Sequence, residues 1–170
     1  MMASKLEIPA GFHSGRLAAY LHNHLIGMAD ALDGIWSFIL DAPNSECSAD
    51  LRRVVDAIVE DDRTLRELMV ELGISPRFAG LGRAHDSGVV ARSRPRDLDR
   101  DRLIELEHLV AGSRARAGMW ACVDGLFADH PQYDGDFAWR AVRAEEEAAQ
   151  LERRCLPTAL SFWRGVRKAS

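Results

Sequence analysis

The segment LIELEHLVAGSRARAGMWACVDGLF, residues 103–127, carries the clearest pattern in the chain. Its apolar residues recur at steps of three, four or seven, as they do along the buried side of an α-helix. They are Leu103, Leu106, Val110, Ala117, Trp120 and Phe127. Charged and polar residues lie beside them: Glu105, Glu107, His108, Arg114 and Arg116. Acids at the edge of an apolar helix side predict a helical bundle that holds either a metal or a network of ion pairs.

Length and composition indicate a single globular domain. The chain has 170 residues, of which 47% are hydrophobic and 28% charged, so it can bury a core and is too apolar for disorder. Its net charge of −4 lacks the cationic excess of nucleic-acid-binding proteins, so no nucleic-acid partner is expected. No apolar run reaches the length of a membrane span, and residues 1–15 contain no apolar signal core. We therefore expect a cytoplasmic protein with no membrane partner.

The three cysteines are expected to be reduced. Cys47, Cys122 and Cys155 lie far apart in the sequence and form no CxxC motif. An odd number of widely spaced cysteines favours free thiols over disulfides or a zinc site. Cys122 and Cys155 fall in predicted helices, where small apolar side chains commonly fill the core.

Two long helices are predicted in the first half, after an N-terminal tail at residues 1–13. The first runs over residues 14–40 with Ser14 as N-cap, and His24 lies within its apolar stripe. The second runs over residues 48–72, and Gly73 is expected to cap its C-terminus. The apolar stripe of this second helix is Leu51, Val54, Ile58, Leu65, Leu68 and Leu72, and Asp61 interrupts it near its middle. The two helices are expected to be antiparallel neighbours because their connection is short.

Two more helices are predicted in the second half. One starts near residues 97–99 and ends before Asp129, and the other starts near residues 134–136. Pro157 should end or kink the last helix, leaving residues 158–166 as a short extra helix or a bent continuation. Together, residues 14–170 are predicted to form one helical-bundle domain.

The segment between the second and third helices decides the topology. Residues 74–96 contain three glycines, two prolines and five arginines without a helical period. A connection this long is uncommon in a compact domain, but it suits a bundle in which the two flanking helices run parallel. A helix of 25 residues spans roughly 38 Å, and a linker of 23 residues can reach roughly 75 Å.

One potential metal ligand lies on or beside the apolar stripe of each helix: His24, Asp61, Glu107 and Glu152. Histidine and carboxylates suit iron, manganese or zinc, and a bundle site of this kind points to iron or manganese. Glu152 is preferred to Glu145 because its height along the bundle differs from that of Glu107 by roughly 5 Å rather than 15 Å.

A bound metal competes with a second interpretation, in which the same acids form ion pairs. Helical di-metal sites carry Glu-x-x-His on two helices, but Thr64 follows Asp61 and Ala148 follows Glu145 at the required offset. The ion-pair interpretation, which we favour, joins Glu145 to Arg116 and Glu107 to Arg153. Either arrangement would satisfy buried acids.

Three segments resemble a group of uncharacterised bacterial proteins of the ferritin-like superfamily: YLHNHLIG (residues 20–27), IVEDDRTLRELMVELG (58–73) and LIELEHLVAGSRARAGMW (103–120). This resemblance implies an all-α ferritin-like four-helix bundle with a long crossover between the second and third helices, and it places His24, Asp61 and Glu107 where ligands would lie. Active members use a di-iron site for ferroxidase, oxygenase or peroxide chemistry. Because the Glu-x-x-His motifs are missing, we expect a non-catalytic structural or partner-binding protein with a degenerate metal site, forming a homodimer. The alternative is a di-metal protein or oxidase that binds iron or manganese.

Overall fold

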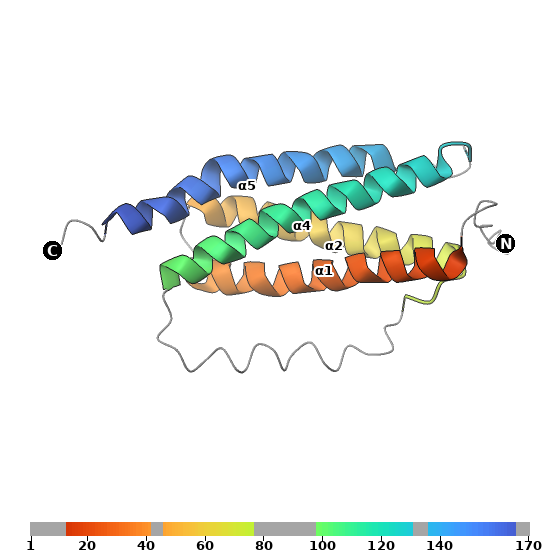
Figure 1. The fold of residues 1–170 in the computed structure, drawn as a ribbon, viewed down its shortest axis with the longest axis horizontal. Coiled ribbons are helices and arrows are strands. Elements are labelled where there is room, and N and C mark those ends of the chain that lie inside the picture. The colour runs from red at the N-terminus through yellow and green to blue at the C-terminus, as the bar shows by residue number, and fades with distance from the viewer. Residues whose placement is uncertain (1–12, 42–45, 77–97, 131–135, 166–170) are drawn as a thin grey trace.

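The fold is all-helical. A computed structural model describes residues 13–41, 46–76, 98–130 and 136–165, and within these ranges it contains helices and no β-strand. The four helices are α1 (Ser14–Asp41), α2 (Glu46–Glu71), α4 (Leu98–Phe127) and α5 (Phe137–Gly165). They lie side by side as an elongated bundle (Figure 1). The predicted all-α bundle is confirmed, and none of the described helices is long and apolar enough to span a membrane.

Contacts between helices fix their directions. Cys47 at the start of α2 is bonded to Cys155 towards the end of α5, whereas Asp61 further along α2 contacts Arg140 near the start of α5. Helices α2 and α5 are therefore antiparallel. Figure 1 shows α4 and α5 antiparallel as well, so α2 and α4 run in the same direction. Residues 77–97, which join them and include the predicted run of arginines, lie outside the described residues.

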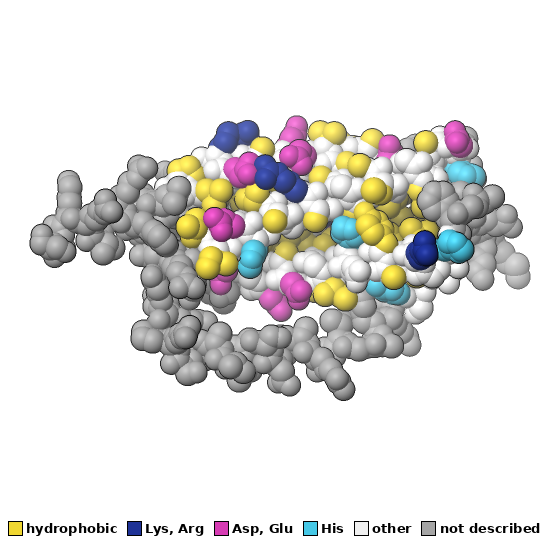
Figure 2. Space-filling model, in the orientation of Figure 1, with side chains coloured by type: hydrophobic (Ala, Val, Ile, Leu, Met, Phe, Trp, Pro, Cys, Tyr) yellow, Lys and Arg dark blue, Asp and Glu magenta, His cyan; other side chains and the backbone are white. Residues whose placement is uncertain are grey.

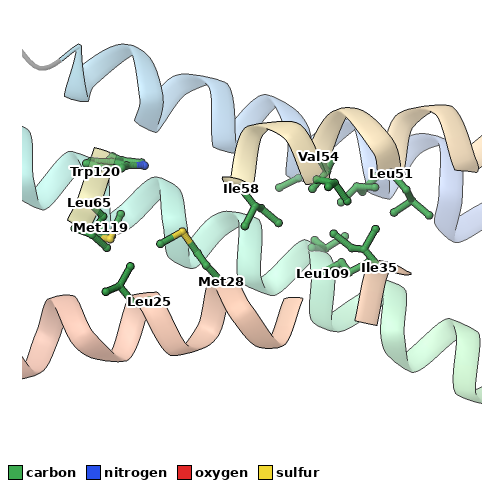
Figure 3. Close-up of a cluster of buried hydrophobic side chains, with 14 of the residues drawn as sticks. Leu25, Met28, Ile35, Leu51, Val54, Ile58, Leu65, Leu109, Met119 and Trp120 are labelled. Atoms are coloured by element: carbon green, nitrogen blue, oxygen red, sulfur yellow. The ribbon is translucent and has the colours of Figure 1, made fainter. Parts of the chain in front are cut away.

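The core lies along the axis of the bundle and is built from the apolar stripes of all four helices. Figure 3 shows it extending from Leu65 and Trp120 at one side of the view to Leu51 and Ile35 at the other. The stripe of α2 is fully buried, including Asp61. Burial of such a stripe stabilises a helix more than its intrinsic propensity does, which explains why the helical period predicted these residues well.

Glycine ends α2 as the sequence predicts. Gly73 has a φ of 72°, a left-handed conformation that glycine adopts without steric cost. Its N–H donates to the carbonyl of Val70 at 3.0 Å, and the N–H of Ile74 donates to the carbonyl of Met69 at 2.7 Å. This pair of bonds is a Schellman motif, and it turns Ile74 back into the core.

One predicted helix start needs correction, and one prediction with two alternatives is decided. The carbonyl of His13 accepts a bond from the N–H of Leu17 at 3.1 Å, so His13 rather than Ser14 occupies the N-cap position of α1. Pro157 lies inside α5, which continues to Gly165 as one helix. Of the two predicted outcomes for the residues after Pro157, the continuation of the last helix is confirmed and the separate short helix is wrong. A helix can continue through proline because the loss is confined to one hydrogen bond and a local kink.

Candidate functional site

Asp61 is the centre of a buried ion-pair layer. It projects from α2 into the core and is 0% exposed. Two arginines of α5 donate to its Oδ1, Arg140 through Nη1 at 2.9 Å and Arg143 through Nη2 at 2.6 Å. From α4, Nε of Arg116 lies 3.0 Å from Oδ2. One carboxylate thus joins three helices.

Two further acids balance the charge of this layer. Glu60 of α2 accepts from Nη1 of Arg143 at 2.6 Å and from Nη2 of Arg140 at 3.3 Å. Glu147 of α5 accepts from Nη2 of Arg116. The layer therefore contains three guanidinium groups and three carboxyl groups. We define the ion-pair layer as these six residues: Glu60, Asp61, Arg116, Arg140, Arg143 and Glu147.

Burial and charge act differently on the two outer acids. Burial raises the pKa of Glu147, and this effect exceeds the opposing attraction of Arg116 and Arg143. The hydrogen bond from Arg143 lowers the pKa of Glu60, assisted by the charge of Arg140. The difference follows from position, because Glu60 reaches the edge of the bundle while Glu147 lies further inside.

Aromatic rings hold two of the arginines in place. The guanidinium of Arg140 lies 5.5 Å from the centroid of the buried Trp120 ring. The guanidinium of Arg143 lies 4.7 Å from that of Trp139, which is exposed. Contacts of this kind attract a cation to the face of the ring. Each ring therefore adds a favourable contact to an arginine that also pairs with Asp61.

The four predicted metal ligands lie in different surroundings. Asp61 belongs to the ion-pair layer, and Glu152 pairs with Arg114 of α4 at 2.7 Å. Glu107 is exposed on α4. His24 is half-buried on α1 and packs edge-on against the ring of Tyr20. Within the described parts of the chain, no three His, Cys, Asp or Glu side chains lie together as a metal-binding group.

This arrangement does not fit a di-metal centre. The buried carboxylate that would serve as its central ligand is already held by three cations. Like charges a few ångströms apart repel strongly inside a protein, so the site that accommodates three guanidinium groups disfavours a divalent metal. The chemistry of the residues present supports charge pairing.

The particular ion pairs differ from those predicted. Arg116 pairs with Glu147 and not with Glu145, and Glu145 lies 3.7 Å from Arg114. The predicted pairing of Glu107 with Arg153 is not seen between these two described residues. Arg116 and Glu145 were predicted to lie at similar heights along the bundle, but successive side chains of a helix point in directions 100° apart. Which of two neighbouring acids faces Arg116 therefore depends on the rotation of α5 about its axis.

Four of the six members of the layer were not predicted from the sequence: Glu60, Arg140, Arg143 and Glu147. Arg140 and Arg143 lie three residues apart on α5, beside the small apolar residues Ala141 and Ala144. Residues at this spacing share one side of a helix. The sequence did contain a signal for these two partners. Arg140 and Arg143 lie at the margin of one apolar stripe, and Asp61 lies inside another, so the arginines could have been predicted to pair with it.

A disulfide corrects the prediction that all cysteines are reduced. Cys47 of α2 and Cys155 of α5 are bonded, with Cα atoms 5.5 Å apart, a separation typical of disulfides. The two residues are 108 positions apart in sequence, so nothing local indicated that they meet. One helical turn away, buried Asp50 accepts from Gln150 at 2.8 Å.

Cys122 is a free thiol and is exposed on α4, not buried in the core as predicted. It lies beside Tyr20 of α1. Burial, with a hydrogen bond to Cys122, raises the pKa of Tyr20 to about 12. The phenol therefore keeps its proton to a higher pH than an ordinary tyrosine does.

Comparisons of this chain with known proteins found no matching family model, no matching curated protein and no matching solved structure. A function for the chain therefore has to be inferred from its own geometry.

Proposed function

We propose that this protein is a non-catalytic, ferritin-like helical bundle with a structural or partner-binding role, in which an ion-pair layer occupies the place of a metal centre. The observation that carries the proposal is Asp61, fully buried and contacted by arginines from two other helices. The parallel directions of α2 and α4 support a ferritin-like chain path, since that order requires the chain to return along the bundle between them.

The ion-pair layer can set the register of the helices. Moving two charged groups from water into a protein interior costs several kcal/mol per ion unless their pairing is nearly ideal. A shift of α5 by one turn would carry Arg140 and Arg143 about 5.4 Å away from Asp61. The layer therefore penalises alternative packings that an apolar core alone would tolerate.

Exposed aromatic and apolar side chains support a partner-binding role. Trp139 and Val142, one turn apart on α5, are 53% and 57% exposed. Tryptophan is enriched at the centres of protein interfaces. The homodimer expected from the sequence belongs to this proposal, and light scattering after gel filtration would test it, with Trp139→Ser as the variant expected to become monomeric.

Metal analysis tests the proposal against the oxidase alternative. The protein would be produced in cells supplied with iron and manganese, and its metal content compared with that of Asp61→Asn. We expect less than about 0.1 equivalents of either metal in both, because three arginines hold Asp61. Stoichiometric iron or manganese in the wild type that disappears in Asp61→Asn would overturn the proposal.

The disulfide bears on the cellular compartment. Bonds such as Cys47–Cys155 persist in oxidising compartments and are rare in the cytosol. The cytoplasmic location expected from the sequence therefore stays a prediction. Counting thiols on freshly isolated protein under denaturing conditions distinguishes the two cases, since one reactive thiol indicates an intact bond and three indicate a reduced chain.

A further inference from the structure

A pocket of about 220 Å³ opens between α1 and α4. Its base consists of apolar side chains from three helices: Met28 of α1, Ile58 of α2 and Leu109 of α4. These three also belong to the hydrophobic core (Figure 3). Figure 2 looks onto the side of the bundle where α1 and α4 lie in front, with hydrophobic side chains visible between them. The pocket is thus an apolar recess in the bundle wall.

Hydrogen-bonding side chains line this recess from opposite helices: Asn23 and His24 of α1, and Ser113 and Arg116 of α4. Ser113 of α4 is only 3% exposed, and His24 of α1 is half-buried. Neither side chain forms a hydrogen bond within the described ranges. Neither side chain is among the described polar groups that are fully buried and unpaired, so solvent reaches their polar atoms through the pocket. A molecule in the pocket could replace this water and bond the two side chains.

Two glycines also line the pocket wall. A Cβ atom added at Gly27 of α1 or Gly112 of α4 would meet nothing within 4 Å. The same holds at Gly15, Gly34, Gly118 and Gly125, which lie outside the lining residues, so this open space is not peculiar to the pocket. Gly27 and Gly112 are therefore positions beside the pocket where a larger side chain has room.

The charge of the pocket is balanced. Arg116 also lines the pocket, but its guanidinium is already paired with Asp61 and Glu147. Burial lowers the pKa of His24, so its ring is neutral at pH 7. An anionic ligand would gain little from Arg116 and would lose its hydration on entering an apolar recess.

We propose that this pocket binds a small, uncharged, mostly apolar molecule that carries one hydrogen-bonding group, of the size of a substituted phenol. An apolar cavity of about 150 Å³ accommodates benzene, so a pocket of about 220 Å³ has room for a substituted single ring. Ser113 and His24 would bond the polar group, while Met28, Ile58 and Leu109 contact the ring. This inference goes beyond the structural role, because it concerns a site beside the ion-pair layer.

Titration by protein-observed NMR, using the full chain, tests the proposal with three probes. Para-cresol has the ring and the hydroxyl, toluene lacks the hydroxyl, and benzoate carries a charge. We expect para-cresol to bind with a Kd below about 1 mM, near the weak end of specific affinities, and to bind more tightly than toluene and benzoate. Absence of para-cresol binding, or tighter binding of benzoate, would overturn the proposal.

Three variants locate the binding. Gly112→Leu should fill the pocket and weaken para-cresol binding at least tenfold, whereas Gly118→Leu, the same change on the same helix outside the lining residues, should alter it less than twofold. Ser113→Ala should weaken para-cresol about 3- to 10-fold, the loss expected for one hydrogen bond, and leave toluene unchanged. Equal effects of Gly112→Leu and Gly118→Leu would show that the probe binds elsewhere and would refute the assignment. If Gly112→Leu does not fold, the contrast between the two probes in Ser113→Ala decides in the same way.

Discussion

Neutralising Asp61 is the most direct test of the ion-pair layer. In Asp61→Asn the side chain keeps its shape, but three guanidinium groups face two carboxyl groups instead of three. Asp61 accepts two charge-assisted hydrogen bonds, at 2.9 and 2.6 Å, and each is worth about 1.5–3 kcal/mol. Breaking a buried ion pair by removing one partner costs about 3–5 kcal/mol. We therefore expect Asp61→Asn to lower the free energy of unfolding by about 3–5 kcal/mol, a large part of the roughly 5–15 kcal/mol of a typical domain.

Urea unfolding followed by circular dichroism measures this loss, and the neighbouring acid supplies the control. Asp62 pairs with Arg66 on the same helix, and both side chains are partly exposed, at 27% and 41%. Exposed pairs contribute at most about 1 kcal/mol, so Asp62→Asn should shift the midpoint little. If Asp61→Asn costs less than about 1 kcal/mol, no more than the loss expected for an exposed pair, the buried layer does not hold the bundle together and the reasoning is refuted.

A double-mutant cycle keeps the test informative if Asp61→Asn is too unstable to measure. Arg143→Gln removes one guanidinium from the layer, so the double variant again has equal numbers of positive and negative groups. Neighbouring charged residues show coupling energies of about 0.5–3 kcal/mol. We expect Arg143→Gln to rescue part of the stability lost in Asp61→Asn, and independent, additive effects would contradict the layer.

The remaining predictions concern other parts of the fold. Cys155→Ala should lower the free energy of unfolding by up to about 4–5 kcal/mol, the chain-entropy value for so long a loop, while Cys122→Ala should cost less than about 0.5 kcal/mol in the same urea assay. Burial lowers the pKa of His24, so the folded state binds its proton less readily than the unfolded chain. Stability should therefore fall as the pH drops below about 6.5, the ordinary histidine value. The fall should be smaller in His24→Phe, as urea midpoints at pH 7.5 and 5.5 would show. Gly73→Ala should cost about 1 kcal/mol because its φ of 72° disfavours a Cβ atom, and an unchanged unfolding temperature would contradict that.

Much of the local structure follows from patterns within single helices. The spacing of Leu51, Val54 and Ile58 predicted the buried side of α2, and it placed Asp61 on that side as well. Gly73 marked the end of the same helix. These predictions succeeded because a helical period and a left-handed cap depend on residues within one or two turns of each other.

Asp61 also shows where the sequence stops being sufficient. A carboxylate on an apolar stripe must be paired or bound to metal, and the sequence by itself left both choices open. The partners Arg140 and Arg143 lie about 80 residues away in sequence, and Arg116 pairs with Glu147 although the sequence predicted Glu145.

The sequence by itself determined that the chain forms helices, which side of each is buried, and that a charge lies inside the core. Only the tertiary structure decided that arginines neutralise that charge, that Cys47 meets Cys155, and that α1 and α4 leave a pocket beside His24. The physical reason is rotation. A turn of 100° per residue means that a small change in how one helix lies against another selects a different partner, and no pattern within one helix specifies that rotation.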